Sequence, residues 1–535
     1  MESVDGDAVG AWAHAAATAL EAARGPLDSL NVFPVADADT GTNLYLTIAQ
    51  GADEVDALGP GANAARAMRA FARGALLGAR GNSGVIASQF LLGLANSLPS
   101  PLLDCPVFDD AGFGPAALAR ALDEAQRAAR AAVARPVEGT ILTAATAAAA
   151  AAHTAARDDS DLGATSLAAL RGAREALART PDELAVLRAA RVVDAGAAGL
   201  VVILEALVGI ITGRPAPGTV PIAGRSPGPA GPPEEDPPDG EFEVMFLVES
   251  AAGDLAPELS RRLQGLGKSV AVVGGPGVWQ AHVHTDDPAA AVAAGSVGTQ
   301  RQITVRHLRA HGGSSGGPVA ERLGVVVGTR APALIRELAR AGAVVMVLTG
   351  SPADAASVLR AVVDTGATQV AVLPGSPDAH AAAMAAAGAP ASGRASTVGA
   401  GGAPVWLHVV DAVDDVRVVA GLAAVVAGRS SPPIGTTGEP ADAVAHVALE
   451  LAAIRAAVAG VRTAEVAGTG AAVARRVADD LLADGGEVLT MLRGAGADDA
   501  VLDLLLEHLA DVHPGLEVVV VEGGQVSPAL VLAVE

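Results

Sequence analysis

The chain gathers polar groups between two predicted helices in the stretch Leu30-Asn31-Val32-Phe33-Pro34-Val35-Ala36-Asp37-Ala38-Asp39-Thr40-Gly41-Thr42-Asn43. On a helix Asp37 and Asp39 would diverge, but in a turn both carboxylates can converge on one cation. Carboxylate oxygens suit Mg²⁺, whose coordination is often completed by water and substrate phosphates. Residues 40–43 open the next predicted helix, whose unpaired N–H groups favour an anion. The stretch therefore predicts a magnesium-nucleotide site, although the same residues are also good turn and helix-capping chemistry.

Three further loops carry glycine and polar residues in an alanine-rich background. They are Gly78-Ala79-Arg80-Gly81-Asn82-Ser83-Gly84-Val85, Pro136-Val137-Glu138-Gly139-Thr140-Ile141-Leu142-Thr143 and Val192-Val193-Asp194-Ala195-Gly196-Ala197-Ala198-Gly199-Leu200. In the first of them, glycines permit close approach of the backbone, and Asn82 and Ser83 offer hydrogen bonds at a helix start. An ordinary turn between two helices explains this loop equally well.

The composition excludes several classes of function. The 535 residues include 36 Lys and Arg against 59 Asp and Glu, which gives a net charge of −23 at pH 7. Such an acidic chain is a poor candidate for binding a nucleic-acid backbone or an anionic lipid surface, because both require clustered cations. The single cysteine, Cys105, excludes an internal disulfide and a cysteine-rich zinc module. The start of the chain lacks the cationic segment of a secretory signal, so a soluble, cytoplasmic protein is expected.

The chain is expected to be multidomain, with an all-α domain followed by two α/β domains. Residues 1–212 consist of helical segments, and the apolar stretch 195–213 is expected to be a buried helix rather than a membrane span, because it contains a glutamate. Residues 213–240 are rich in proline and glycine and are expected to be a linker. Residues 241–311 form the middle α/β domain. In the C-terminal domain, residues 319–535, strand candidates alternate with helices as in a doubly wound parallel sheet.

A second polar pattern, in the middle domain, is Ala281-His282-Val283-His284-Thr285-Asp286-Asp287-Pro288. On a strand, His282 and His284 lie on one face, a geometry in which two imidazoles can hold one metal ion or phosphate. An aspartate followed by Pro288 is also a good helix start. On the local pattern alone, a purely structural role for the two histidines is the simpler interpretation.

The four polar loops, in this order within one helical domain, resemble the nucleotide-binding L domain of the dihydroxyacetone kinase family and, more closely, the ATP-binding subunit of bacterial fatty acid kinase. That family reads Asn-Val-Phe-Pro-Val-Pro-Asp-Gly-Asp-Thr-Gly-Thr-Asn, Gly-Ala-Arg-Gly-Asn-Ser-Gly-Val, Pro-Val-Glu-Gly-Thr-Ile-Leu-Thr and Val-Val-Asp-Ala-Gly in these loops. The resemblance implies a helical barrel (DhaL-type) that holds Mg-ATP at one end. The chain departs from the family at Ala36, Ala38 and Ala197, which stand in place of Pro, Gly and Gly.

The resemblance also implies which residues form the nucleotide site. Asp37 and Asp39 are implied to be the metal ligands, and Asn31 stands where the dihydroxyacetone kinases place a third aspartate. The residues implied to surround the nucleotide are Thr40, Gly41, Thr42, Asn43, Asn82, Ser83, Gly84, Thr140 and Asp194. The implied cofactors are ATP and Mg²⁺.

In the middle domain the same family carries His-Val-His-Thr-Asp-Asp-Pro, and its two histidines, with an upstream cysteine, are associated with a bound zinc and with activity. By resemblance, the residues expected to act in catalysis or to contact the acyl substrate are His282, His284, Thr285 and Asp286. Glu243 stands where the family has its cysteine, and a carboxylate can also bind Zn²⁺. A zinc ion near His282, His284 and Glu243 is therefore one expectation.

The C-terminal domain resembles the family down to Glu522-Gly523-Gly524-Gln525. It departs in one loop, where the family usually has Gly-Gly-Gln-Thr-Met-Asn-Pro-Ser and this chain has Leu348-Thr349-Gly350-Ser351-Pro352-Ala353. Divergence of a ligand- or partner-contacting loop is one interpretation of this difference. By resemblance, the domain is expected to bind the partner that carries the substrate.

Together the motifs and the resemblance predict an ATP-dependent kinase of the fatty acid kinase type. A fatty-acid-binding carrier protein would present a fatty acid, whose carboxylate attacks the γ-phosphate of ATP to give an acyl phosphate. A carboxylate is already ionised at neutral pH, so the attack requires no general base. Two alternatives stay open: a kinase for a small hydroxy-ketone such as dihydroxyacetone, and a regulatory subunit that binds ADP without catalysis. Homodimers are allowed, whereas nucleic acid and stable membrane insertion are not expected.

Overall fold

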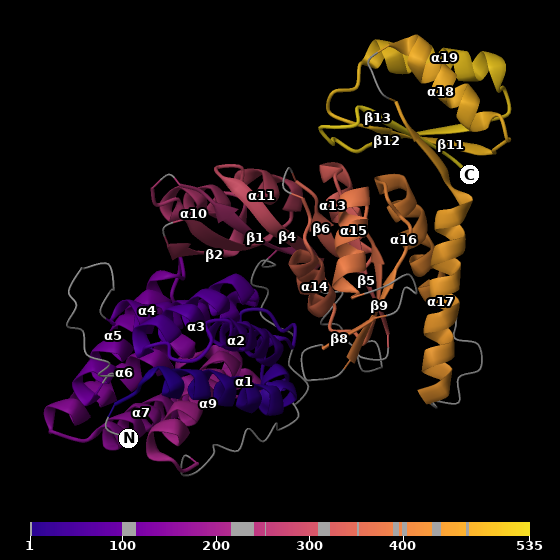
Figure 1. Cartoon of the computed structure of the whole chain (residues 1–535). Coiled ribbons are helices and arrows are strands. Elements are labelled where there is room, and N and C mark those ends of the chain that lie inside the picture. Colours follow the sequence, from indigo (N-terminus) through magenta and orange to yellow (C-terminus); the bar gives the residue numbers. More distant parts are fainter. Residues whose placement is uncertain are drawn as a thin grey trace. The chain divides into compact units, whose positions relative to one another are not determined.

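The computed structural model describes residues 3–98, 114–215, 240–308 except 252 and 276, 322–349, 352–388, 395–398, 404–430, 440–466 and 470–535. The chain divides into two compact units, of which the first comprises Met1–Gly240 and Ser250–His284 and the second Glu241–Glu249 and Thr285–Glu535 (Figure 1). The predicted middle domain, residues 241–311, therefore contributes to both units. Most of the expected linker and Cys105 lie outside the described residues.

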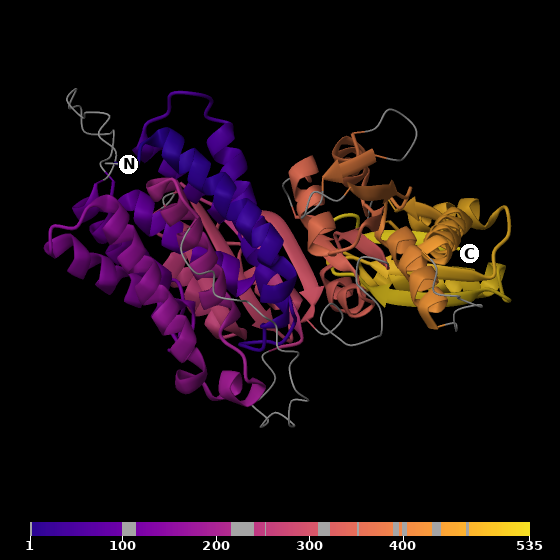
Figure 2. The same ribbon diagram turned by 90° about the horizontal axis from the view of Figure 1, so that it is seen from below.

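Helices form the part of the first unit that precedes the linker, as the alanine-rich composition predicts. Their bounds are α1 (Gly6–Ser29), α2 (Thr40–Asp56), α3 (Ala64–Gly78), α4 (Gly81–Asn96), α5 (Pro115–Ala131), α6 (Ile141–Arg157), α7 (Leu162–Glu183), α8 (Ala185–Ala190) and α9 (Ala195–Thr212). In Figure 2 these helices, coloured indigo to magenta, lie side by side. The expected helical domain is thus confirmed, while its closure into a barrel stays a prediction.

Small residues let these helices pack closely. Gly93 of α4 faces the backbone of α5, because a Cβ added to it would lie 2.5 Å from the Cα of Ala125. A Cβ on Gly51 of α2 would lie 2.5 Å from the ring of Phe71 in α3. That ring meets the ring of Trp12 edge to face within the core, with centroids 5.4 Å apart. The helices therefore approach each other through glycine and alanine, around a few large side chains.

Helix α9 is long and apolar enough to span a membrane by composition alone, yet 72% of it is buried within the chain. The carbonyl of Ile203 in this helix accepts a hydrogen bond from the indole N–H of Trp12 at 3.0 Å. Helices α1, α6 and α7 pack against α9. This is the environment of a core helix.

The first unit also contains an α/β segment made of α10 (Ala256–Gln264) and the neighbouring strands β2 (Gly267–Gly275) and β3 (Val278–Thr285). Two contacts join this segment to the helices. Val133, which follows α5, forms an antiparallel bridge with Ala271 of β2. Gln280 of β3 donates a hydrogen bond from Nε2 to the carbonyl oxygen of Ala79, a residue 201 positions earlier, at 2.8 Å. Strand β3 is therefore held against the loop that precedes α4.

The strands of the second unit that belong to its larger sheet follow the order β1-β4-β6-β5-β7-β9-β8. Their bounds are β1 (Phe242–Glu249), β4 (Thr299–His307), β5 (Leu323–Thr329), β6 (Val344–Val347), β7 (Gln369–Leu373), β8 (Ala395–Val398) and β9 (Pro404–Val409). The neighbours β6, β5, β7 and β9 are parallel, as the alternating pattern predicts. The pairs β1/β4, β4/β6 and β8/β9 are antiparallel. The strands expected to form a doubly wound parallel sheet are thus parallel to one another. The sheet as a whole is mixed, because antiparallel strands flank the parallel ones on both sides.

Helices connect these strands and bury their apolar side chains. They are α11 (Pro288–Ala294), α13 (Ile335–Arg340), α14 (Ala355–Asp364), α15 (Pro377–Ala386), α16 (Asp415–Ser430) and α17 (Pro440–Gly460). In the core around β5, β6 and β7, Val326, Val344 and Val370 pack with Val358 of α14 and Ala383 of α15. Valine-rich runs of this kind are typical of strands covered on their faces by helices.

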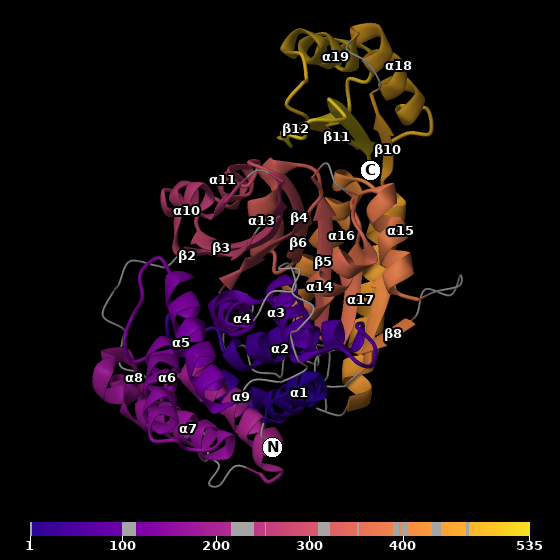
Figure 3. The same ribbon diagram turned by 60° about the vertical axis from the view of Figure 1, so that its left-hand side comes forward.

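A smaller four-stranded sheet, with the order β10-β13-β11-β12, follows α17. It is built from β10 (Arg462–Glu465), β11 (Val488–Arg493), β12 (Glu517–Glu522) and β13 (Leu530–Val534), together with α18 (Ala471–Leu482) and α19 (Asp499–Val512). Figures 1 and 3 both show the two helices on the same face of this sheet. Leu489, Leu505 and Leu532 share the buried core beneath them. The α/β character expected after the linker is confirmed in both sheets.

Candidate functional site

The acidic loop predicted to bind Mg²⁺ lies between α1 and α2, and three of its polar residues form one hydrogen-bonded cluster. The Nδ2 of Asn31 donates to the carboxylate of Asp37 and to the carbonyl of Val35, the latter at 3.1 Å. The Oδ1 of Asn31 accepts a hydrogen bond from the hydroxyl of Thr40 at 2.7 Å. Asn31 and Thr40 are buried, so the packed protein restrains the orientation of the Asp37 carboxylate.

Asp39, the second predicted carboxylate ligand, occupies the N-cap position of α2, and its side chain does not bond to the first turn of that helix. The preceding residue, Ala38, has a φ of 55°, in the left-handed region that glycine adopts most readily. The related family has glycine at this position. An alanine there is therefore a strained residue directly between the two acids.

Asp28, a residue that the motifs did not single out, binds the start of α2 from the last turn of α1. Its Oδ1 accepts from the backbone N–H of Thr42 at 2.9 Å, and its Oδ2 accepts from the hydroxyl of Thr42 at 2.8 Å. Burial raises the pKa of Asp28 to about 6, and the nearby charge of Asp39 acts in the same direction. The sequence contained one indication of this role, which is the position of Asp28 near the end of a predicted helix. The helix dipole disfavours a carboxylate there unless the carboxylate has another partner.

The second glycine-containing loop lies against the first turn of α2. Gly81 begins α4 with a φ of 53°, and a Cβ on it would lie 2.4 Å from the Nδ2 of Asn43. The backbone N–H of Arg80 donates to the hydroxyl of Thr47 at 3.2 Å, and that hydroxyl donates to the carbonyl of Asn43 at 2.7 Å. A Cβ on Gly84 would lie 2.3 Å from the same hydroxyl. The structure thus brings the loop and the start of α2 together, and only glycine fits at the contact.

Asn82 and Ser83 occupy the first turn of α4, half-buried. Within the part of the chain that the structure describes, neither side chain makes a hydrogen bond. Amide and hydroxyl groups at a helix start, beside unpaired backbone N–H groups, are suited to an anionic ligand. These two side chains are therefore candidates for contacting the nucleotide.

Thr140 and Asp194, which the resemblance places at the nucleotide, cap two helices. Thr140 begins α6, where its hydroxyl accepts from the N–H of Leu142 at 3.3 Å. Asp194 begins α9, where its carboxylate accepts from the N–H of Ala197 at 2.7 Å, and its pKa also reflects a hydrogen bond from the N–H of Ile141. The carboxyl group is fully buried, and this burial raises its pKa to about 6. Both residues thus hold the starts of α6 and α9 together.

The two histidines of the middle-domain motif lie side by side on β3 in the first unit. Both are buried, with their ring centroids 4.9 Å apart and their planes inclined by 59°. The alternation of a strand explains why they share a face, as the spacing predicts. A buried pair of imidazoles of this kind is suited to a metal ion or to an anion.

The remaining motif residues belong to the second unit and have structural partners there. The hydroxyl of Thr285 accepts from the N–H of Asp287 at 3.0 Å, and Asp287 caps α11. Asp286 accepts from the N–H of Glu241 at 2.9 Å. The helix start that the sequence suggested at Pro288 is thus present.

Glu243, the residue that stands in place of the family's cysteine, is buried on β1 in the second unit. It forms an ion pair with Arg306, its partner in the antiparallel register of β1 and β4. A guanidinium beside a carboxylate competes with a metal ion for the same oxygens. Because Glu243 and the two histidines belong to different units, the three-residue zinc set stays a prediction.

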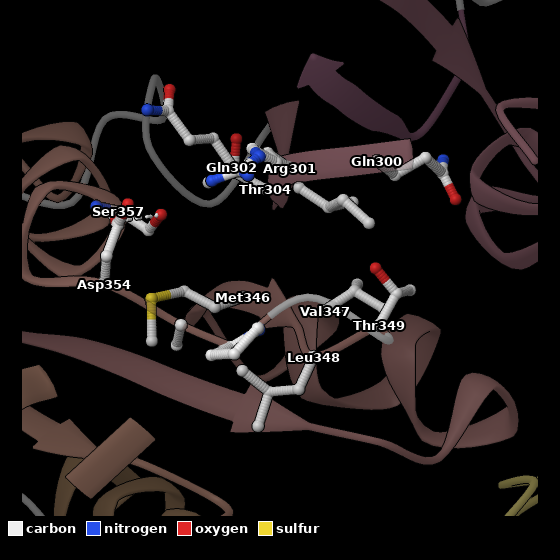
Figure 4. A pocket seen from close by; sticks show the side chains of 13 residues that line it. Gln300, Arg301, Gln302, Thr304, Met346, Val347, Leu348, Thr349, Asp354 and Ser357 are labelled. Atoms are coloured by element: carbon white, nitrogen blue, oxygen red, sulfur yellow. Dashed lines mark hydrogen bonds between the residues drawn. The ribbon is translucent and has the colours of Figure 1, made fainter. Parts of the chain in front are cut away.

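A cavity that is partly open to solvent lies in the second unit and was not anticipated from the motifs. It lies where β4 and β6 separate, since their pairing is limited to Thr304↔Met346 and Val305↔Val345. Figure 4 shows Arg301, Gln302 and Thr304 of β4 across the cavity from Met346 and Val347. The residues around it are Gln300, Arg301, Gln302, Ile303, Thr304, Met346, Val347, Leu348, Thr349, Pro352, Ala353, Asp354 and Ser357. The lining thus includes part of the loop in which the chain departs from the related family.

Comparison with known families agrees with the order of these parts. Residues 34–209 match the DAK2 domain, residues 239–314 match the middle domain of the FakA-like fatty acid kinase family, and residues 452–535 match the C-terminal domain of that family. The chain is a FakA-like protein of the DAK family. The DAK2 match covers the four polar loops from residue 34 onward, and the middle-domain match covers the two histidines and Glu243.

Individual relatives match over part of their length. Protein YloV of Bacillus subtilis (strain 168) is 36% identical over 217 residues, which are 41% of this chain and 37% of that protein. An uncharacterized protein of Staphylococcus aureus (strain USA300) is 37% identical over 188 residues, 35% of this chain and 32% of its own. The dihydroxyacetone kinase of C. freundii, in its native form, is 20% identical, with a TM-score of 0.27 over 37% of this chain and 34% of that one.

Proposed function

We propose that this FakA-like protein is an ATP-dependent kinase that phosphorylates the carboxylate of a fatty acid presented by a separate carrier protein. One observation supports this most strongly. In the first unit, the cluster of Asn31, Asp37 and Thr40 lies at the start of α2, and the loop that carries Asn82 and Ser83 packs against the first turn of the same helix. The segments that carry possible oxygen ligands for Mg²⁺ and possible donors for phosphate thus both contact the N-terminal part of α2.

The donor set fits magnesium rather than a softer metal. Two carboxylates, from Asp37 and Asp39, and the amide oxygen of Asn31 are hard ligands, and Mg²⁺ prefers such oxygens together with water and phosphate. When bound, Mg²⁺ supplies charge neutralisation for the triphosphate. The chain itself supplies the hydrogen-bond donors of Asn82 and Ser83 and the N–H groups at the starts of α2 and α4. Phosphoryl transfer depends on this kind of positioning more than on covalent chemistry.

The acceptor side is assigned to the histidine strand. An ionised fatty acid needs no general base, so the residues around it have to position its carboxylate and offset its charge. The buried pair His282 and His284 is suited to that task, either directly or through a zinc ion. Thr285 and Asp286 follow on the same chain segment and remain in the proposed site.

The carrier protein is proposed to contact the second unit near the cavity between β4 and β6. The lining combines an apolar floor from Met346 and Leu348 with polar groups such as Thr304 and Ser357. Such a mixed lining suits a protein side chain better than a fatty acyl chain, which requires a continuous apolar tunnel. Because this carrier would bring the lipid in solution, the proposed location of the protein is the cytoplasm.

The test is a turnover assay with purified full-length protein, ATP, Mg²⁺ and oleate, with and without a purified fatty-acid-binding carrier. Formation of acyl phosphate, trapped with hydroxylamine, is expected only when the carrier is present. Failure to bind Mg-ATP or Mg-ADP in calorimetry would overturn the proposal. Phosphorylation of dihydroxyacetone without a carrier would instead assign the chain to the hydroxy-ketone kinases.

A regulatory ADP-binding role is the second candidate, and one observation favours it. Glu243 is paired with Arg306 where the related family has a metal-associated cysteine, so the acceptor side differs from that family in its chemistry. Tight ADP binding, with no turnover for any acceptor in the presence of the carrier, would establish this alternative.

A further inference from the structure

The hydrogen bond between Gln280 and Ala79 links the two parts of the first unit that the proposed function assigns to nucleotide and acceptor. Gln280 lies on β3, two residues before His282, and is 1% exposed. Its Nε2 donates to the carbonyl of Ala79 at 2.8 Å. Ala79 immediately precedes the loop Arg80–Gly84, so this bond holds the main chain at the base of the loop.

The other side of that loop is held by α2. The N–H of Arg80 bonds to the hydroxyl of Thr47, and Gly81 fits against Asn43 without space for a Cβ. The loop is therefore clamped between the helix that follows Asp37 and Asp39 and the strand that carries the histidines. A change in loop position on one side has to be accommodated by contacts on the other, because close-packed interiors leave no free space.

Gln280 has a further property that ordinary packing does not explain. Within the described residues no group donates a hydrogen bond to its Oε1, although this atom is buried. A buried acceptor without a donor costs free energy, so an apolar side chain of similar size would be favoured if packing alone were required. We therefore attribute the presence of an amide at this position to its Nε2, which donates to the carbonyl oxygen of Ala79.

We propose that Gln280 is a positioning residue that holds the Ala79–Arg80 main chain in the nucleotide-binding arrangement and couples it to the His282/His284 strand. The inference rests on the proposed nucleotide site in residues 1–212. By linkage, a nucleotide that orders the loop also orders β3, and the loss of the Gln280 bond removes both effects.

The test compares full-length Gln280→Met, Gln280→Glu and the matched control Gln89→Met with wild type. Gln89 is also a buried glutamine with an unbonded Nε2, but it lies within α4 and does not contact Ala79 through a hydrogen bond. In calorimetry at pH 8, Mg-ADP affinity is expected to fall about tenfold for both Gln280 variants and to stay within about twofold for Gln89→Met.

The pH dependence of Gln280→Glu separates positioning from packing. An ionised glutamate cannot donate to Ala79, whereas its protonated carboxyl group, which is favoured at low pH, can donate. Relative to wild type at the same pH, the affinity of Gln280→Glu is expected to recover at pH 5.5, while that of Gln280→Met stays low. Equal deficits of the two variants at both pH values would overturn the positioning role.

Hydrogen exchange, measured by mass spectrometry, keeps this inference distinguishable from the proposed function. Without nucleotide, Gln280→Met is expected to exchange faster than wild type in residues 78–86, and Gln89→Met is not. Mg-ADP is expected to slow exchange in residues 278–286 of wild type but not of Gln280→Met. If wild type binds no nucleotide but Gln280→Met still exchanges faster than wild type in residues 78–86, the proposed function fails and the positioning of the loop stands. Unchanged exchange and affinity in Gln280→Met would overturn the inference alone.

Discussion

At the scale of single residues, the acidic pair of the first loop differs from Asp28 and Asp194 in its hydrogen bonds. Asp37 is hydrogen-bonded to Asn31 just before α2, whereas the half-buried Asp28 and the buried Asp194 accept hydrogen bonds from backbone N–H groups at helix starts. The first arrangement suits a metal ligand, and the second suits a structural cap. The two kinds of aspartate therefore give different expectations when they are changed.

Replacement of both Asp37 and Asp39 by alanine is expected to weaken Mg-ADP binding by about 100-fold, because the hard oxygen ligands are lost. Calorimetry at fixed Mg²⁺ concentration measures the effect. The control is Asp7→Ala, which removes an exposed carboxylate from the first turn of α1 and is expected to leave affinity unchanged. Undiminished binding in the double variant would remove the basis of the magnesium site.

Asp194→Asn is expected to stabilise the folded chain above pH 6 and to have a smaller effect below pH 4. Burial raises the pKa of Asp194 from 3.8 to about 6, so the folded chain retains a proton that the unfolded chain has released. Its contribution to the free energy of unfolding therefore falls as pH rises from about 4 to 6, by at most about 3 kcal/mol. An asparagine can still accept from Ala197 without carrying a buried charge.

Thermal unfolding of Asp194→Asn and wild type across this pH range measures the difference. The matched control is Asp161→Asn, which changes an exposed N-cap that accepts from the N–H of Ala164 at 2.7 Å. A stability difference of Asp194→Asn that is independent of pH would contradict the assignment of a raised pKa.

At the scale of elements, the start of α2 depends on how closely α1 approaches it. Gly41 lies at this contact, and a Cβ on it would be 2.4 Å from the carbonyl oxygen of Arg24 and 2.7 Å from the Cβ of Leu27. The approach places Asp28 of α1 within reach of Thr42. The packing of two helices thus decides which groups surround the acidic pair.

Gly41→Ala is expected to destabilise the chain by about 1–3 kcal/mol, because the added methyl group forces α1 and α2 apart. It is also expected to weaken Mg-ADP binding, since α2 carries the phosphate donors. Gly25→Ala in α1 is the matched control: nothing lies within 4 Å of its added Cβ. That variant is expected to gain about 0.4–1 kcal/mol of stability, and chemical unfolding of both variants tests the contrast.

At the scale of the whole molecule, the chain combines a largely helical unit that carries the nucleotide motifs with a unit whose sheets mix parallel and antiparallel strands. The strands β4 and β6 separate after two residue pairs, and a cavity occupies the space between them. This division predicts that nucleotide binding and carrier recognition can be changed independently.

Leu348→Arg, which places a cation in the cavity lining, is expected to raise the KM for the carrier about tenfold and to leave Mg-ADP affinity unchanged. Steady-state kinetics with varied carrier concentration and calorimetry with Mg-ADP measure the two effects. Leu449→Arg on α17 is the control, because Leu449 is 69% exposed and does not line the cavity. Equal KM values for the two variants would argue against this site for the carrier.

Much of the fold followed from local sequence signals. Alanine-rich segments without internal proline predicted helices, and apolar runs alternating with helices predicted strands, because both depend on the nearest neighbours along the chain. The spacing of His282 and His284 predicted their shared face for the same reason. The strands flanking the parallel sheet were not predicted to be antiparallel, since strand direction depends on which distant strand becomes the neighbour.

The sequence by itself thus determined the helical domain of residues 1–212, the acidic loop at 31–43 and the histidine pair, all of which arise from residues close together in the chain. Only the tertiary structure decided that Asp28 binds Thr42, 14 residues away, and that Gln280 binds Ala79, 201 residues away. It also decided that Glu243 pairs with Arg306. The physical reason is that these partners are selected by packing between elements, and no local pattern records which buried donor will meet which acceptor.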